Sequence, residues 1–137
     1  MRIVLDTSVL VAAARSALGA SHAIIRRIPD PRFEICLSVS LYHEWQAVMS
    51  RPENLPSGQT PADALNFVRY LASMAHLQDI HFLWRPFLTD PDDDMVLELA
   101  FAARADLIVT HNQRDFRGCE SLGVRVISPA EFIKKLP

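Results

Sequence analysis

The segment MRIVLDTSVLVAAA, residues 1–14, decides the fold class of this chain. Its first five residues form a mostly apolar run, three polar residues follow, Asp6, Thr7 and Ser8, and a second apolar run begins at Val9. The first run predicts a buried strand and the second predicts a helix. In open α/β sheets the active-site crevice lies at the carboxyl ends of the strands, so a carboxylate between this strand and this helix is a candidate functional residue.

Strand and helix patterns alternate along the rest of the chain. Strands are expected at 2–5, 33–37, 107–109 and 124–127, with an edge strand at 80–83, and helices at 9–17, 21–27, 40–50, 61–75 and 92–103 and from 129 onward. Ser21 and Ser40 are the expected caps of two of these helices, and Ser128 forms a capping box with Glu131. The alternation predicts a mostly parallel sheet with helices on both faces.

Length and composition favour one globular domain, residues 1–137. Hydrophobic residues make up 50% of the chain, which is enough for a sizeable core. Lys and Arg number 14 and Asp and Glu number 16, so the net charge is −2. This balance excludes the strongly basic surface of an ordinary nucleic-acid-binding protein. A polyanionic substrate must therefore be bound locally.

Cysteine usage and hydropathy predict a cytoplasmic protein. Cys36 and Cys119 have no second cysteine at metal-ligand spacing, which indicates a reducing compartment and no disulfide framework. The first apolar stretch is interrupted by Asp6, unlike that of a signal peptide. The chain also lacks the run of about 18 apolar residues that a membrane span needs.

Polar residues recur where strands end or helices begin. Asp6 follows the first strand, Glu44 lies in the helix after the second strand, residues 92–94 are three aspartates at the start of a later helix, and residues 110–115 follow another strand. In a doubly wound sheet these positions share one edge and can converge. Converging carboxylates without lysine partners repel one another, and a divalent cation relieves that repulsion. Oxygen ligands favour Mg²⁺ or Mn²⁺.

Each acidic residue also has a purely structural interpretation. Asp6 could cap the first helix, and Glu44 could be one solvated residue on an amphipathic helix. The aspartates at 92–94 could favour a helix N-terminus by about 0.3 to 1 kcal/mol per charge, although three in a row exceed what capping needs. The five histidines show no ligand spacing, so they are expected on the surface or, hydrogen-bonded, in the core.

Three other classes of acidic site fit less well. An EF-hand loop beginning at Asp90 would need a glycine and a glutamate where Met95 and Phe101 stand. A haloacid-dehalogenase-like phosphatase would need a second aspartate where Ser8 stands, with its acidic pair after Thr110 rather than before it. A receiver domain would need a lysine after its last strand, and the only two lysines lie at the C-terminal end.

With these motifs in view, the chain resembles the PIN-domain family over essentially its whole length. The matching segments are IVLDTSVL at 3–10, SVSLYHE at 38–44, RPFL at 85–88 followed by DPDDD at 90–94, and LIVT at 107–110. The resemblance is closest to the branch of VapC-type ribonucleases, the toxins of toxin-antitoxin systems. It implies a three-layer α/β/α sandwich.

The resemblance implies a metal-dependent ribonuclease whose acidic quartet holds one or two Mg²⁺ or Mn²⁺ ions. Asp6 and Glu44 match its first two acidic positions, and the third falls on Asp93, with Asp94 as the alternative. The fourth position, commonly an aspartate, is occupied by Asn112. Either Asn112 or Asp115 would then hold a second ion, so two-metal occupancy is left open.

The remaining implied site residues would bind substrate, and they are Thr7, Ser8, Thr110, Arg85 and Arg114, with Arg117 as a further candidate. The implied partners are RNA, an antitoxin that covers or enters the acidic cleft, and a second copy of the chain, with the apolar helix at 64–75 as a contributor to the dimer. Two alternatives stay open. The chain could be a catalytically weakened binding or regulatory module, with Asn112 as the sign of erosion, or an RNA-processing nuclease outside a toxin-antitoxin system.

Overall fold

The computed structural model describes residues 1–81, 88 and 90–136 and contains a parallel sheet of five strands. The strands are β1 (Arg2–Leu5), β2 (Glu34–Leu37), β3 (His76–Leu77), β4 (Leu107–Val109) and β5 (Arg125–Ile127). Their order across the sheet is β3-β2-β1-β4-β5, and every neighbouring pair is parallel. The expected α/β class with a mostly parallel sheet is confirmed.

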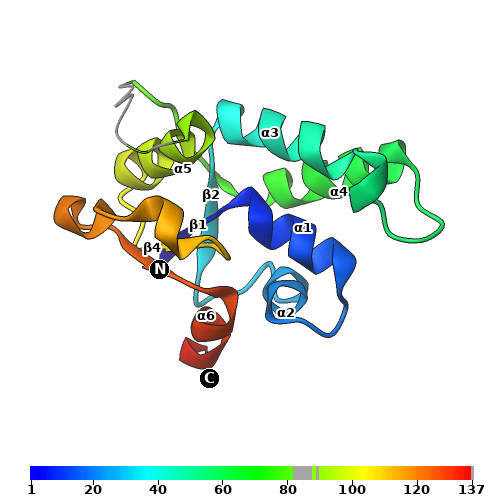
Figure 1. The fold of residues 1–137 in the computed structure, drawn as a ribbon, viewed down its shortest axis with the longest axis horizontal. Helices are drawn as coiled ribbons and strands as arrows, with labels where there is room; N and C mark the ends of the chain where they lie inside the picture. The colour runs from blue at the N-terminus through cyan, green and yellow to red at the C-terminus, as the bar shows by residue number, and fades with distance from the viewer. Residues whose placement is uncertain (82–87, 89, 137) are drawn as a thin grey trace.

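Within the described residues, six α-helices cover the sheet. They are α1 (Thr7–Arg15), α2 (Ala20–Arg26), α3 (Val39–Met49), α4 (Pro61–Ser73), α5 (Pro91–Ala102) and α6 (Pro129–Lys135), with short 3₁₀ helices η1 (Pro52–Asn54), η2 (Gln113–Phe116) and η3 (Cys119–Leu122). Figure 1 shows α1, α2 and α4 on one side of the strands and α5 on the other, and α6 packs against α2. The result is the three-layer α/β/α sandwich.

The core lies on both faces of the central strands. Ile3, Val4 and Leu5 of β1 are fully buried, and so are Ile108 and Val109 of β4. Strands buried on both faces are continuously apolar rather than alternating. This is why short apolar runs identified β1 and β4 from the sequence.

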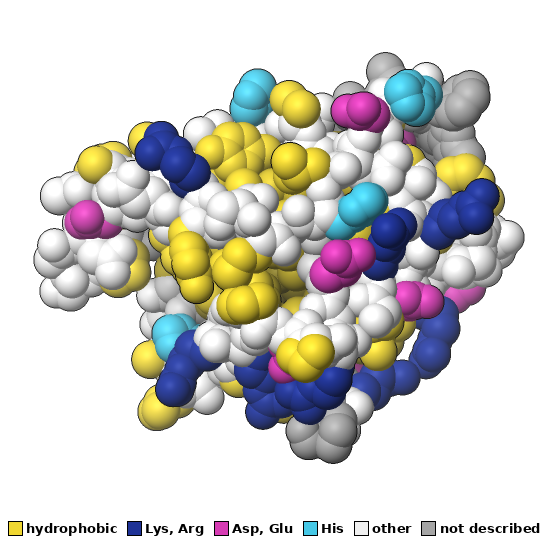
Figure 2. All heavy atoms as spheres, turned by 180° about the vertical axis from the view of Figure 1, so that it is seen from behind, with side chains coloured by type: hydrophobic (Ala, Val, Ile, Leu, Met, Phe, Trp, Pro, Cys, Tyr) yellow, Lys and Arg dark blue, Asp and Glu magenta, His cyan; other side chains and the backbone are white. Residues whose placement is uncertain are grey.

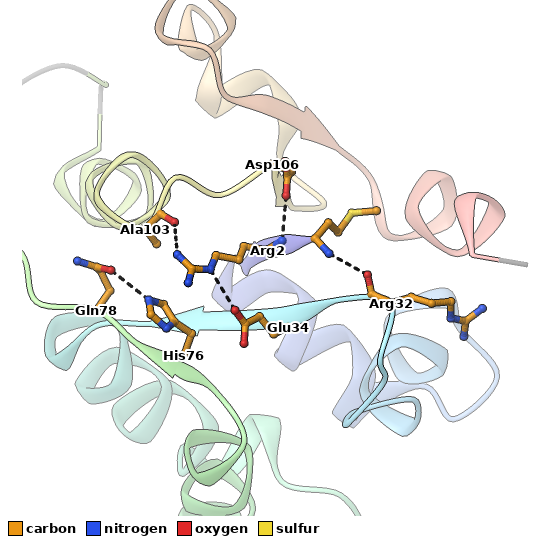
Figure 3. Close-up of polar contacts among 8 residues, drawn as sticks. Arg2, Arg32, Glu34, His76, Gln78, Ala103 and Asp106 are labelled. Atoms are coloured by element: carbon orange, nitrogen blue, oxygen red, sulfur yellow. Dashed lines mark hydrogen bonds and ion pairs between the residues drawn. The ribbon is translucent and has the colours of Figure 1, made fainter.

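The amino-terminal ends of the strands are joined by contacts of Arg2, shown in Figure 3. The backbone N–H of Arg2 donates to Asp106 Oδ2 at 2.9 Å, and its guanidinium donates to Glu34 Oε1 and to the carbonyl oxygen of Ala103, both at 3.0 Å. These contacts tie β1 to β2 and to the segment that precedes β4. The relative position of the three central strands is therefore fixed at this edge.

The connections from β1 and β4 leave the sheet in opposite directions. From β1 the chain proceeds to β2 and β3, and it then returns through α5 to β4 and β5. The boundary between β1 and β4 is thus the switch point of the sheet, where ligands of open α/β folds bind outside the carboxyl ends of the strands. The first residues after these two strands are Asp6 and Thr110.

Several expected element boundaries were wrong. The first helix begins at Thr7 rather than at residue 9. Ser38, not Ser40, caps α3, because β2 ends at residue 37 and the Ser38 hydroxyl accepts from the N–H of Leu41 at 3.2 Å. Ser21 lies inside α2 instead of capping it. The edge strand lies at His76–Leu77 rather than at 80–83, of which 82 and 83 fall outside the described residues.

Both cysteines are free and buried. Burial raises the pKa of the Cys36 thiol to about 11, and burial with the nearby charge of Glu120 raises that of Cys119 to about 11. Across the part of the chain that the structure describes, no single helix is long and apolar enough to cross a membrane. Helices α1 and α2 reach the length and apolar composition of such a helix only when they are taken together, and a bend of 100° separates them.

Candidate active site at the carboxyl edge of β1 and β4

Asp6 lies at the switch point and is held by two hydroxyl groups. Its backbone N–H donates to the carbonyl oxygen of Val109 at 3.0 Å, which extends the pairing of β1 with β4 by one residue. Its side chain is 7% exposed, and Oδ2 accepts from Ser8 Oγ at 2.7 Å and from Thr110 Oγ1 at 2.8 Å. Although Asp6 occupies the N-cap position of α1, its side chain makes no capping hydrogen bond. The carboxylate is therefore directed to the sheet edge instead of to its own helix.

Each hydroxyl that donates to Asp6 also accepts from a backbone amide. The N–H of His111 donates to Ser8 Oγ at 3.2 Å, and the N–H of Asn112 donates to Thr110 Oγ1 at 3.0 Å. A hydroxyl has one hydrogen, so each of these amides leaves that hydrogen for Asp6 Oδ2. The two hydroxyl oxygens also lie 3.4 Å apart. Both hydroxyls donate to Oδ2, and no residue that the structure describes donates a hydrogen bond to Oδ1 of Asp6.

Glu44 reaches the same edge from α3. Its carboxylate Oε2 accepts a hydrogen bond from the Thr7 hydroxyl at the start of α1, which holds this half-buried side chain beside Asp6. Burial raises the pKa of Glu44, the Thr7 hydrogen bond opposes this rise, and the charges of Asp92, Asp6 and Asp90 add to it. Glu44 therefore shares its surroundings with several carboxylates.

Asp93, in the first turn of α5, is the most perturbed carboxyl group of this region. Burial raises its pKa from 3.8 to about 7, and the charges of Asp6, Asp90, Asp115 and Asp92 contribute in that order. The charge of Asp6 thus acts on both Glu44 and Asp93. We call Asp6, Glu44 and Asp93 the acidic site.

Asp94 has a different environment from its neighbour. It is 1% exposed, and its Oδ1 accepts from the backbone N–H of Leu88 at 2.7 Å. Successive residues of a helix point about 100° apart, so Asp93 and Asp94 face different surroundings. Asp94 holds the chain just ahead of α5, whereas the pKa of Asp93 is raised by the charges of Asp6 and of other nearby carboxylates.

The segment after β4 brings further candidates close. Thr110 is fully buried, whereas Asn112, Arg114 and Asp115 are exposed on the loop and η2 that follow. The charge of Asp115 is among those that raise the pKa of Asp93, so Asp115 lies within reach of the acidic site. The Asn112 side chain makes no hydrogen bond within residues 1–81, 88 and 90–136, and its backbone N–H supports Thr110.

Two of the three arginines expected to bind substrate lie in the described part of the chain. Arg114 and Arg117 are exposed on and directly after η2. Arg85, which is also expected to bind substrate, lies outside the described residues. Ion pairs seen in the described ranges join Arg2 to Glu34 and Arg32 to Asp30, away from the acidic site.

The acidic site suits a hard cation by the chemistry of its donors. Its described members offer carboxylate oxygens, with amide and hydroxyl oxygens beside them, which is the donor set preferred by Mg²⁺ and Mn²⁺. Among the described residues, no three His, Cys, Asp or Glu side chains are already close enough to form a metal cluster. The carboxylates share one electrostatic environment, and a bound cation would require them to approach further.

One contact of this region was not expected from the sequence. His111 Nε2 lies 2.7 Å from the hydroxyl of Ser21, which is 2% exposed on α2. The two residues are 90 positions apart, and neither has a recognisable ligand spacing. No sequence pattern could have identified this pair.

Comparisons with known proteins identify the family and the fold of this chain. A family model described as "PIN domain" matches residues 2–114, and no curated protein matches the chain. A chain in the crystal structure of VapBC2 from Rickettsia felis, bound to a DNA fragment from their promoter, has a TM-score of 0.64 and 14% identity over 93% of this chain and 98% of that one. A chain of VapBC-1 from nontypeable Haemophilus influenzae has a TM-score of 0.63 and 14% identity over 95% and 99%. Identity at this level shows a shared fold, and the family match over most of the chain shows that it belongs to the PIN-domain family.

Proposed function

We propose that this PIN-domain protein is a ribonuclease that uses Mg²⁺ or Mn²⁺ to hydrolyse RNA phosphodiester bonds. The proposal is supported by the shared electrostatic environment of Asp6, Glu44 and Asp93, which come from three separate segments: the charge of Asp6 raises the pKa of both Glu44 and Asp93. None of the three forms an ion pair with a described basic residue. The pKa values of Glu44 and Asp93 are raised, and Asp6 is buried and held by two hydroxyl donors. Such a group of carboxylates is costly to keep for structural reasons alone.

Each member of the acidic site would have a separate task. Asp6 would offer the metal its Oδ1, because Oδ2 is already occupied by the hydroxyls of Ser8 and Thr110. Asp93 would be the second ligand, with Asn112 or Asp115 supplying an oxygen to a second ion. When bound, such a metal lowers the pKa of a water ligand and offsets negative charge on the phosphate.

Glu44 would act next to the metal ligands. The Thr7 hydroxyl fixes one carboxylate oxygen, and the raised pKa of Glu44 makes it a better proton acceptor than an ordinary surface glutamate. We assign it the task of orienting the attacking water and accepting its proton. Arg114 and Arg117 are exposed beside this edge and would hold the phosphates of the substrate against the repulsion of the carboxylates.

We further propose that the nuclease is the toxin of a toxin-antitoxin pair and acts in the cytoplasm. The support is the fold shared with chains of VapBC2 and VapBC-1. The antitoxin would cover the acidic site with a basic side chain. A homodimer would bury exposed apolar residues, among them Tyr70 on α4 at 55% and Leu77 on β3 at 69% exposure. Figure 2 shows apolar side chains gathered in the middle of the face turned away from the viewer in Figure 1.

A weakened, non-catalytic binding module is the second candidate, and the observation that favours it is Asn112. An amide oxygen at the fourth ligand position carries no charge and binds a divalent cation less strongly than a carboxylate. On this alternative the chain would bind Mn²⁺ weakly and would not cleave RNA. Both candidates predict the same fold, so activity has to separate them.

The test is cleavage of single-stranded RNA with Mg²⁺ or Mn²⁺, with and without EDTA. Wild-type protein should cleave only with the metal, and Asp6→Asn should reduce the rate by at least about a hundredfold, as expected for the loss of a metal ligand or its close support. Asp79→Asn is the matched control, since Asp79 is exposed and its charge is not among those that raise the pKa of Asp93 or Glu44. EDTA-resistant cleavage, or equal cleavage by Asp6→Asn, would refute the proposal. Growth arrest on expression, relieved by the product of an adjacent gene, tests the toxin role.

A further inference from the structure

We propose that Ser21 and His111 are positioning residues, whose hydrogen bond holds the loop after β4 so that its backbone amides orient the donors to Asp6. The inference deepens the proposed function and rests on it. The Ser21 hydroxyl lies 2.7 Å from His111 Nε2 and is 2% exposed, so the contact is shielded from water on the side of α2. Helix α2 contributes no carboxylate to the acidic site, yet it is tied to the segment that completes it.

The loop needs such a tie because the sheet pairing ends just before it. The last backbone contact to the sheet is the N–H of Thr110, which donates to the carbonyl oxygen of Ile127 at 3.0 Å. Residues 111–115 are all exposed, and η2 is a single short turn. Two described side chains anchor this stretch to other parts of the protein. They are Gln113, which donates to Val126 and Glu131 on the β5 side, and His111, which contacts Ser21 on the α2 side.

His111 is also the residue through which a displacement of the loop would reach Asp6. Its own N–H donates to Ser8 Oγ, and the next N–H, that of Asn112, donates to Thr110 Oγ1. Both hydroxyls then donate to Asp6 Oδ2. If the imidazole ring is released from Ser21, only Gln113 still anchors the loop by its side chain, so both amides gain freedom to move and direct the hydroxyl hydrogens to one carboxylate oxygen less firmly. Oδ1 of Asp6 then loses its distinct, donor-free state.

A simpler interpretation is that the contact only satisfies two polar groups of the fold. In that case its loss would reduce the free energy of unfolding without a specific effect on the loop amides or on metal binding. The positioning role predicts local changes at His111, Asn112 and Asp6 in a protein that stays folded. The two interpretations therefore differ in measurable quantities.

The variants are Ser21→Ala and His111→Phe, with His111→Gln as the conservative replacement that keeps a hydrogen-bonding group near the place of Nε2. His22→Gln is the matched control, because His22 also lies on α2 but its Nδ1 contacts the carbonyl oxygen of Ala13, away from the loop. Circular dichroism would confirm that each variant is folded. Two quantities would then be measured for all four variants and the wild type.

The first quantity is the hydrogen-exchange rate of the His111 and Asn112 amides in metal-free protein, followed by NMR. Ser21→Ala and His111→Phe should raise both rates by about two- to tenfold, the effect of losing one net hydrogen bond, while the control and His111→Gln stay near wild type. Unchanged exchange in both variants would overturn the proposed role of the contact. This measurement needs no metal, so it decides the matter even if the nuclease proposal fails.

The second quantity is the dissociation constant for Mn²⁺ alone, measured by electron paramagnetic resonance. The same two variants should weaken Mn²⁺ binding by about tenfold, the lower end of the effect of removing a residue that orients a metal ligand. Faster amide exchange with unchanged Mn²⁺ affinity would overturn the link to the acidic site. Failure of the wild type to bind Mn²⁺ would overturn that link together with the proposed function.

Discussion

Replacing Asp93 with asparagine should stabilise the metal-free protein above neutral pH. The folded state raises the pKa of Asp93 from 3.8 to about 7, mainly by burial and further by the charge of Asp6. At 1.36 kcal/mol for each pH unit the full rise would correspond to about 4 kcal/mol. Asp93 is only partly buried, so solvent screening reduces the penalty to about 1–2 kcal/mol.

The pH dependence follows from the direction of this pKa change. Below about pH 4 the carboxyl is protonated in both the folded and the unfolded state, so it imposes no penalty. As pH rises from about 4 to about 7, the unfolded state ionises while the folded state keeps its proton, and the free energy of unfolding falls until the full penalty is reached above about pH 7. Asparagine has the same shape and cannot ionise. Asp93→Asn should therefore raise Tm in EDTA by about 3–8 °C near pH 8, for a domain of this size, and leave it unchanged near pH 4.

Thermal unfolding followed by circular dichroism is the assay, with Asp79→Asn as the control. Asp79 is exposed, so its replacement should change stability by less than about 0.5 kcal/mol at either pH. Added Mn²⁺ should stabilise the wild type and have a smaller effect on Asp93→Asn, because a ligand stabilises only the state that binds it. An Asp93→Asn variant that is no more stable than the wild type near pH 8 would refute the reasoning.

Three further outcomes are expected. Thr110→Val keeps the side-chain shape but removes a donor to Asp6, so it should lower the free energy of urea unfolding by about 1–2 kcal/mol; an unchanged value would show that this hydroxyl does not support the carboxylate. Arg104 follows α5 with a φ of 52°, which favours glycine, so Arg104→Gly should raise that free energy by about 0.5–1 kcal/mol, and a loss would count against backbone strain there. Because burial raises the thiol pKa of Cys36 and Cys119 to about 11, a thiol reagent near pH 8 should label them only in urea, and rapid labelling of native protein would contradict their burial.

The central strands and Asp6 could be predicted from the sequence because their signals are local. Strands β1 and β4 are buried on both faces, so an uninterrupted apolar run was sufficient to identify them. Asp6 follows the first of these runs directly, and the rule that sites lie at the carboxyl ends of parallel strands gave its place. Strand β3 was misplaced because it has only two residues, of which Leu77 is exposed, and so it carries no apolar signal.

Finer distinctions depended on packing that no sequence pattern encodes. Ser38 and Ser40 are equally good caps by type, and the end of β2 decides between them. Asp93 and Asp94 are adjacent and chemically identical, and only the packing of α5 turns Asp94 toward the N–H of Leu88. For such residues the three-dimensional structure is needed.

The most direct test of the central claim is a titration of Mn²⁺ into the wild type and Asp6→Asn, followed by electron paramagnetic resonance. We expect the wild type to bind Mn²⁺ at submillimolar concentration and Asp6→Asn to bind it at least about tenfold more weakly, as for the loss of a ligand. Equal affinities, or a wild type that binds no Mn²⁺ at millimolar concentration, would contradict the claim that these distant carboxylates form one cation site.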